Sequence, residues 1–215
     1  MPLFQVYRGL SAGFGNGSPA SAWLNTMAQQ AVMDWRAAMV LDGRGYQVRA
    51  GTITTPLVGD VAVTDTAAEM CSDAASGTTL IPIRLGVAIR LGTGTLHEYA
   101  AKSVATVSSG GTAFVALPLK SDGAAAVSTS RVQAAGAVTV TAELATTTAR
   151  HWEYSNPVAV GAGNDAAPLR WEPIAPPVLV GARCFYVQIA ATGTGPSYYA
   201  SYDFLEVPTL LINPS

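Results

Sequence analysis

The chain has 215 residues, of which 49% are hydrophobic and only 12% are charged, with a formal net charge of −2. Globular domains typically carry about 25% charged residues, so this composition indicates a surface that is bland or is covered by other subunits. No run of lysines and arginines occurs at either end, which argues against an arm that packages a genome by neutralising phosphates.

An extended arm is predicted for residues 1–18. Its apolar anchors are Leu3, Phe4 and Val6, and a stretch rich in Gly, Ser and Asn follows them. Because so short an arm cannot bury these side chains by itself, we expect it to become ordered by lying on a neighbouring subunit. The first residues also lack the basic and apolar regions of a secretory signal, so we expect no signal peptide.

One amphipathic helix is predicted over residues 19–41. Ser18 and Pro19 suit the N-cap and first helical positions, and apolar residues then recur at spacings of three and four. Gly43 can supply the C-terminal stop. Arm and helix together form a first unit, residues 1–43.

From residue 44 onward the pattern is that of β-strands. We expect eight principal strands with turn signals between them, filling a β domain over residues 44–209, and a short tail over 210–215. No helices alternate with these strands, which favours an antiparallel sandwich or barrel over a parallel sheet. Residues 61–77 are expected to form a short irregular or helical segment.

The segment TLIPIRLGVAIRL, residues 79–91, predicts one strand far longer than the usual length of about five or six residues. Its odd positions are all large and aliphatic. Arg84 and Arg90 stand an even number of residues apart, so we expect them to share the opposite face, which carries small or charged residues. That face is either simply solvated or a polar subunit contact that pairs with Glu143 or Asp203 of a neighbour.

An aromatic cluster near the end of the chain has two interpretations. Tyr198, Tyr202 and Phe204 would share one face of a strand and Tyr199 the other, with Trp171 nearby in sequence. Strands apolar on both faces are usually buried in a core or by a neighbouring subunit, and we favour this reading. The alternative is an exposed platform that binds a carbohydrate.

Signatures of catalysis and of cofactor binding are missing from the sequence, so we expect no enzyme, no cofactor and no metal. Cys71 and Cys184 are predicted to be unpaired and inert thiols, with a disulfide as the alternative. His97 and His151 are expected to be surface or interface residues, because too few further ligands accompany them to hold a metal. No uncharged apolar stretch reaches the length of about 18 residues that a membrane span needs.

Taken together, the arm, the helix and the strands resemble the eight-stranded jelly rolls of icosahedral virus and bacteriophage capsids, an architecture that lectins and cupins also use. The order of the elements carries this resemblance, which covers the chain from Tyr46 to Val207 and adds the preceding arm and helix. A composition rich in Ala, Gly, Thr and Ser is similar to that of many tailed-phage head and tail proteins. The missing basic arm implies a protein that does not bind the genome directly.

The expected function is therefore that of a virion structural protein, a capsid or capsid-surface component that assembles in the host cytoplasm with identical copies and other virion proteins. Candidate interface residues are Leu3, Phe4, Val6, Arg84, Arg90, Tyr198, Tyr199 and Tyr202. The alternative function is a glycan-binding adhesin or receptor-binding module that uses the Tyr/Trp cluster.

Overall fold

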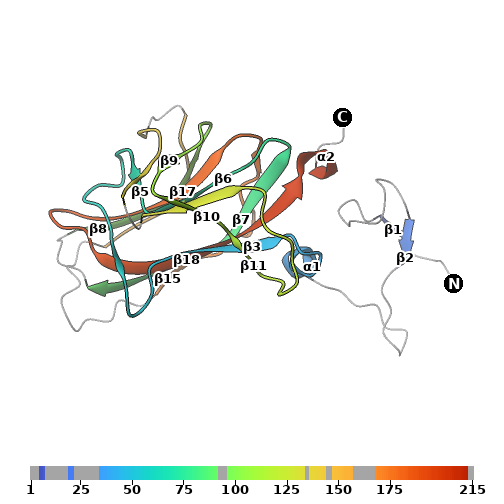
Figure 1. The fold of residues 1–215 in the computed structure, drawn as a ribbon, viewed down its shortest axis with the longest axis horizontal. Helices are drawn as coiled ribbons and strands as arrows, with labels where there is room; N and C mark the ends of the chain where they lie inside the picture. Colours follow the sequence, from blue (N-terminus) through green and yellow to red (C-terminus); the bar gives the residue numbers. More distant parts are fainter. Residues whose placement is uncertain are drawn as a thin grey trace.

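The computed structural model describes residues 5–7, 19–21, 34–91, 96–133, 136–143, 147–156 and 168–212. Within these ranges the chain is mainly β, its sheets are antiparallel, and its helices are short (Figure 1). The described residues contain 18 strands rather than the eight expected, because many loops also form short pairs of two to four residues.

The first large sheet has the strand order β10–β12–β6–β17–β8–β14. Its strands are β10 (Thr112–Val115), β12 (Thr129–Val132), β6 (Met70–Asp73), β17 (Cys184–Ala191), β8 (His97–Val104) and β14 (Ala149–Asn156).

The second large sheet has the order β11–β3–β18–β7–β15, with β4 added to β18 and β16 added to β7. Its strands are β11 (Leu117–Pro118), β3 (Gly45–Ala50), β18 (Ser197–Pro208), β7 (Thr78–Leu91), β15 (Leu169–Trp171), β4 (Leu57–Val58) and β16 (Leu179–Val180).

Two smaller sheets accompany the large ones. One has the order β5–β13–β9 and the other pairs β1 with β2. Their strands are β5 (Ala67–Ala68), β13 (Val138–Thr139), β9 (Ser109–Gly110), β1 (Gln5–Tyr7) and β2 (Pro19–Ser21).

The main core lies between the two large sheets, which face each other as in a β-sandwich (Figure 1). The second sheet contributes aromatic and aliphatic side chains from β3, β7 and β18, and the first sheet contributes those of β6, β8 and β17. A chain of rings crosses this core: Trp171, Phe185, Tyr202, Phe204 and Tyr46 have successive centroid distances of 6.1, 5.3, 6.0 and 5.6 Å. Such contacts join the two sheets into one folding unit.

The long strand over residues 79–91 is confirmed, but its alternation is not continuous. Asp203 of β18 pairs with Arg84, whereas Phe204 pairs with Pro82, so Ile83 is an extra residue in a β-bulge. Leu85 and Val87 consequently face the main core, while Ile81 and Ile83 face outward and pack with Met39, Leu205 and Val207. The prediction that all odd-numbered residues of this strand share one face was therefore wrong, because the bulge turns the odd-numbered residues before it and after it to opposite faces.

The helix prediction is only partly correct. Helix α1 spans Trp35–Leu41, and the Asp34 side chain caps it by accepting a hydrogen bond from the Arg36 amide at 2.8 Å. Gly43, with φ +77°, follows the helix as expected. The predicted start at Pro19 is wrong, because Pro19–Ser21 forms β2 and proline is compatible with the first position of a strand. Residues 22–33 lie outside the described ranges.

Both helices lie at the same end of the sandwich (Figure 1). The short second helix, α2 (Thr209–Ile212), follows β18 directly, and the Thr209 amide donates to the Gly77 carbonyl at 2.9 Å. Helix α1 covers the outward-facing cluster through Met39. Neither described helix is long and apolar enough to cross a bilayer.

Short strands subdivide the β region further. Residues 112–120 contain β10 and β11, which belong to different sheets, and of the described residues 137–143 only Val138–Thr139 form a strand. The segment 61–77, expected to be irregular or helical, contains β5 and β6.

The bulge at Ile83 can be tested by double-mutant cycles that combine Met39→Ala with Ile83→Ala or with Leu85→Ala. We expect the Met39/Ile83 pair to couple by about 0.5–3 kcal/mol in the free energy of unfolding, because the two side chains are in one cluster. The Met39/Leu85 pair, on opposite faces, should couple by less than about 0.5 kcal/mol. Chemical denaturation of the wild type, the three single variants and the two double variants measures both energies. Equal coupling would contradict the face assignment.

Candidate functional site

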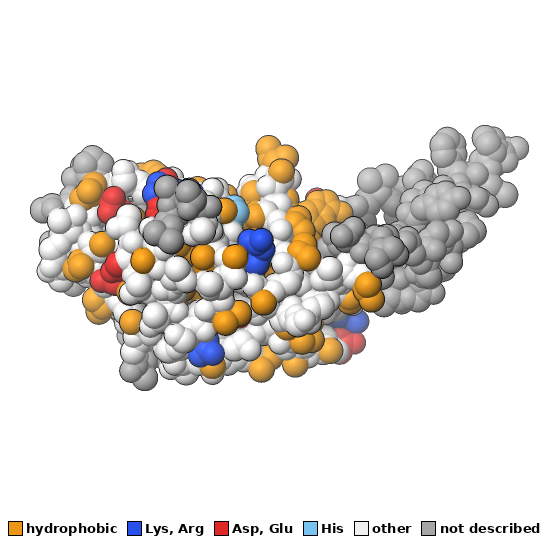
Figure 2. Space-filling model, turned by 90° about the horizontal axis from the view of Figure 1, so that it is seen from above, with side chains coloured by type: hydrophobic (Ala, Val, Ile, Leu, Met, Phe, Trp, Pro, Cys, Tyr) orange, Lys and Arg blue, Asp and Glu red, His pale blue; other side chains and the backbone are white. Residues whose placement is uncertain are grey.

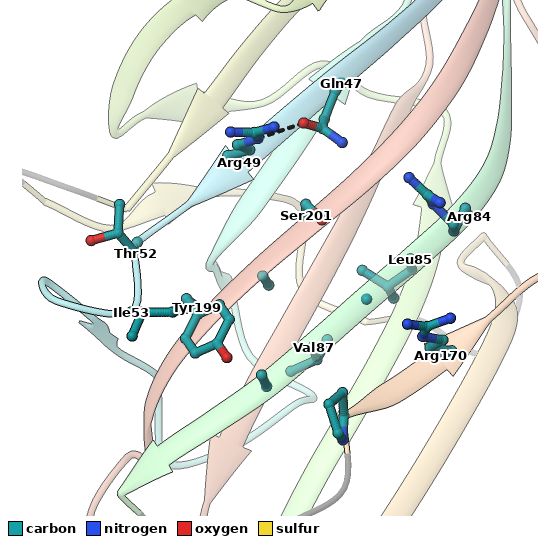
Figure 3. A pocket seen from close by; sticks show the side chains of 15 residues that line it. Gln47, Arg49, Thr52, Ile53, Arg84, Leu85, Val87, Arg170, Tyr199 and Ser201 are labelled. Atoms are coloured by element: carbon teal, nitrogen blue, oxygen red, sulfur yellow. Dashed lines mark hydrogen bonds between the residues drawn. The ribbon is translucent and has the colours of Figure 1, made fainter. Parts of the chain in front are cut away.

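A groove of about 490 Å³ lies on the outer face of the second large sheet, opposite the main core (Figure 3). Residues of β3, β7, β15 and β18 form its floor and sides, and the turn after β3 forms one end. Three arginines line it: Arg49, Arg84 and Arg170. The groove therefore collects a quarter of the 12 Lys and Arg residues of a chain whose net charge is negative.

The floor of the groove follows from the register of the strands. Arg49 is opposite Ser201, Ser201 is opposite Gly86, and Gly86 is opposite Arg170. These four residues thus form one row across four strands, with the small ones in the middle. Since adjacent strands are about 4.8 Å apart, the two arginine Cα atoms are separated by about 14 Å. Their long side chains lie at the two ends of the row, and the floor between them consists of the small residues Ser201 and Gly86.

The third arginine belongs to the neighbouring row. The Arg84 guanidinium lies 2.6 Å from an Asp203 carboxylate oxygen, and Gln47 donates to the other Asp203 oxygen at 2.8 Å. Asp203 is buried, whereas half of the Arg84 side chain is exposed. Figure 3 shows Arg84 and Arg170 on one side of Ser201 and Arg49 on the other, bonded to Gln47. Asp203 therefore fixes Arg84 and leaves part of its guanidinium facing the solvent.

An aromatic side chain completes the groove on the other side of the central row. Tyr199 is opposite Ala88, and Ile53 stands beside it at the end of the groove (Figure 3). Gly51 makes this end possible: its φ of +67° turns the chain out of β3, and a Cβ there would lie 2.9 Å from the Tyr198 carbonyl oxygen. The groove thus combines guanidinium groups, a small floor and an apolar wall.

The predicted interface residues are distributed over different environments. Arg84 and Tyr199 line the groove. Arg90 is exposed and does not line the groove; it lies at a second register shift between β7 and β18. Tyr198 and Tyr202 are buried, as we favoured for the aromatic cluster, but in the core of the chain itself, so neither side chain is available as an interface residue. Their register places both on the inner face of β18. Leu3 and Phe4 lie outside the described residues, as does the side chain of Val6.

The acidic partners suggested for the arginines are used within the chain. Asp203 binds Arg84, as described above. Glu143 forms ion pairs with Lys102 and Arg150, and Lys102 also donates to Gln188 at 3.1 Å. The Lys102 side chain is fully buried, and this burial, together with the positive charge of Arg150, lowers its pKa to about 8. The network connects β8, β14 and β17 through ion pairs and a hydrogen bond.

Among the described residues, one group could place three metal-ligating atoms together: Cys71, Asp73 and Cys184, within 4.8 Å of one another. Asp73, however, already accepts two hydrogen bonds from Ser108 and has the Arg131 guanidinium at 3.7 Å. Because the Ser108 hydroxyl donates to Asp73, the Cys71 thiol must donate to Ser108. A hydrogen bond with Cys71 and burial raise the pKa of Cys184. This group fits a packed polar cluster better than a cation site.

The two histidines were expected at the surface or in an interface, and the structure places them in different environments. His97 is fully buried, with its Nδ1 atom 3.3 Å from the Tyr99 hydroxyl. His151 is half-buried, stacks against Phe185 and has Nε2 at 2.8 Å from the Ser103 hydroxyl. Glu153, two residues further along the same strand, pairs with Arg150. The surface assignment is wrong for His97, because strand β8 is covered on both faces.

Comparison with protein-family models, curated proteins and solved structures finds no match to this chain. The functional interpretation therefore depends on the geometry of the sheets and of the groove. Sequence reasoning found Arg84 and Tyr199 but missed Arg49 and Arg170, which only the strand order brings beside them.

Thiol labelling tests the burial of the cysteines. We expect neither Cys71 nor Cys184 to react with a chromogenic disulfide reagent in the native protein, because both are buried and the pKa of Cys184 is raised. Two thiols should react after denaturation. Ser121→Cys, at an exposed turn, provides a matched native control that should react at once. Rapid native labelling of Cys184 would contradict the described packing.

His151 makes the stability depend on pH. Burial lowers its pKa in the folded protein, so between this value and the usual pKa of about 6.5 the unfolded chain binds more protons. Its contribution to stability is therefore present above pH 6.5 and decreases on acidification. We expect the loss in free energy of unfolding between pH 7.5 and 5.5 to be smaller in His151→Gln than in the wild type. Urea denaturation at both pH values measures this difference, and an equal loss would contradict the assignment.

Proposed function

We propose that this protein is a virion structural component, of a bacteriophage, that assembles with identical copies through a jelly-roll domain. The pairing order of eight strands is the observation that carries the proposal. In chain order these strands are β3, β6, β7, β8, β14, β15, β17 and β18. The first pairs with the eighth, the second with the seventh, the third with the sixth and the fourth with the fifth.

This nested pairing is that of a long antiparallel ribbon folded over on itself. The ribbon's strands divide into the orders β3–β18–β7–β15 and β6–β17–β8–β14, one in each large sheet. Double-sheet jelly rolls with this kind of order are used by viral capsid proteins, lectins and cupins. The remaining strands are short additions at the edges or in loops.

Features outside the strand order support the capsid function over the other two. Cupins hold a metal with clustered histidines inside the roll, whereas the cluster of Cys71, Asp73 and Cys184 packs under the small β5–β13–β9 sheet. The Tyr/Trp platform proposed for glycan binding is not available, because Trp171, Tyr198 and Tyr202 are buried. Only Tyr199 of that cluster lines a groove.

The surface of the described residues supports self-association. Fifteen large hydrophobic side chains are substantially exposed, and Figure 2 shows a face on which charged side chains are few and scattered. Several charges are also neutralised within the chain by ion pairs. An apolar, charge-poor surface is typical of proteins that bury much of it against other subunits.

An exposed apolar edge is the best place to test this proposal. Val115 and Leu117, each 55% exposed, lie where the chain passes from β10 to β11, and these are edge strands of the two large sheets. Strand edges with unpaired backbone groups readily pair with another chain.

Sedimentation velocity at tens of micromolar, together with electron microscopy, tests the assembly. We expect the wild type to form closed oligomers or particles. The double variant Val115→Lys/Leu117→Lys should raise the dissociation constant about tenfold or more, because two lysines would have to be buried at the contact. Val61→Lys, 51% exposed and away from this edge, is the matched control. A monomeric wild type at every salt concentration would contradict the proposed function.

A further inference from the structure

The arginine groove has a surplus of positive charge that the described residues do not neutralise. Three guanidinium groups surround it, and among the described residues Asp203 is the one carboxylate in contact with them. Arg49 is bonded to the neutral Gln47, and Arg170 forms no hydrogen bond or ion pair with any residue that the structure describes. Since a guanidinium presents its donors in a planar fork, such a cluster suits a carboxylate or sulfate group.

The shape of the groove limits the size of the ligand. Ser201, Gly86 and Ala88 leave the floor open to close approach, and the volume of about 490 Å³ is in the range of sites for small molecules. The remaining described arginines do not extend the groove: Arg44, for example, is paired with Asp42 and Arg150 with Glu143. A long polyanion such as nucleic acid needs a continuing track of cations, which the described residues of this sheet face do not provide.

The chemistry of the side walls points to a ring beside the anionic group. Tyr199 has an apolar ring and a polar hydroxyl, and it adjoins the exposed Ile53 at the end of the groove (Figure 3). An amphipathic surface of this kind can pack against the apolar C–H face of a sugar ring, while the hydroxyl groups of the sugar remain in contact with water. The guanidinium groups suit the anionic group of a charged saccharide, and the aromatic wall suits its ring. The volume of the groove fits a ligand of this size.

We propose that the groove binds an acidic saccharide of one or two rings, with its sulfate or carboxylate group held between Arg49, Arg84 and Arg170 and its ring against Tyr199. Of the Tyr/Trp cluster this site uses only Tyr199, because the other rings are buried. It goes beyond the proposed assembly function and does not depend on it, because single subunits already contain the complete groove.

Isothermal titration calorimetry at low ionic strength tests the site on the full chain. The probes are a heparin-derived sulfated disaccharide, the same disaccharide without sulfate groups but with its uronate carboxylate, and a neutral disaccharide. We expect saturable binding of one or both acidic probes, and the stronger of the two identifies the anionic group. The dissociation constant of the neutral disaccharide should be at least about tenfold higher than that of the acidic probes. Added salt should weaken the binding of the acidic probes, because it screens their charge.

Variants connect the binding to the groove. Arg49→Gln and Arg170→Gln should each raise the dissociation constant about tenfold or more, because each loses charge-assisted hydrogen bonds. Arg183→Gln, an exposed arginine before β17 that does not line the groove, should bind as the wild type does. Thermal unfolding controls for folding, since the exchanged side chains of Arg49 and Arg170 are exposed.

Several results would overturn the proposal. They are the absence of saturable binding, equal binding of the neutral and acidic disaccharides, and unchanged binding by both groove variants. Tighter binding of a single-stranded oligonucleotide through the same arginines would also overturn it, because the ligand would then be a nucleic acid. None of these outcomes affects the sedimentation result, so the two proposals can fail separately.

Discussion

The pairing of β18 with β7 is the interaction on which the rest of the molecule depends. The two strands are joined through twelve residue pairs, and β18 also pairs with β3 along its other side. Its inner face supplies Tyr202 and Phe204 to the core, and its outer face supplies the groove and the cluster under α1. Because one strand determines both faces, the core and the groove cannot change their register independently.

Buried acids fasten the loops to this central pair. The Glu206 carboxylate of β18 accepts hydrogen bonds from the amides of Val127 and Ser128 at 2.8 and 2.7 Å, which holds the loop before β12. Asp203 on the same strand positions Arg84 and Gln47. A chain with few charged residues thus uses several of them in buried hydrogen bonds and ion pairs, which leaves fewer charged residues at the surface. This use explains in part why the exposed surface is so apolar.

The sequence was informative where a strand is long and rich in large apolar residues. β7 and β18 could be predicted because long alternating patterns distinguish strands from helices. β6 could not, because its residues are buried on both faces and three of the four are small or polar, as in Cys71 and Ser72. The bulge at Ile83 leaves no signal in the pattern, because every nearby odd position is aliphatic. The groove could be predicted only in part. Gly86 and Ala88 between two arginines indicate a floor of small residues, but Arg49 and Arg170 are far away in the sequence, and only the strand order places them at the groove.

The positions of the two chain ends of the sandwich have a mechanical consequence. β3, the first strand of the core, and β18, the last, are antiparallel neighbours, with Gly45 opposite Leu205 close to the end where both helices lie (Figure 1). Force applied through α1 and α2 would therefore open these strands one hydrogen-bonded pair at a time, as in a zipper, rather than shear all pairs at once. The sandwich pulled by these two ends would therefore resist weakly, because the hydrogen bonds between β3 and β18 would break one after another.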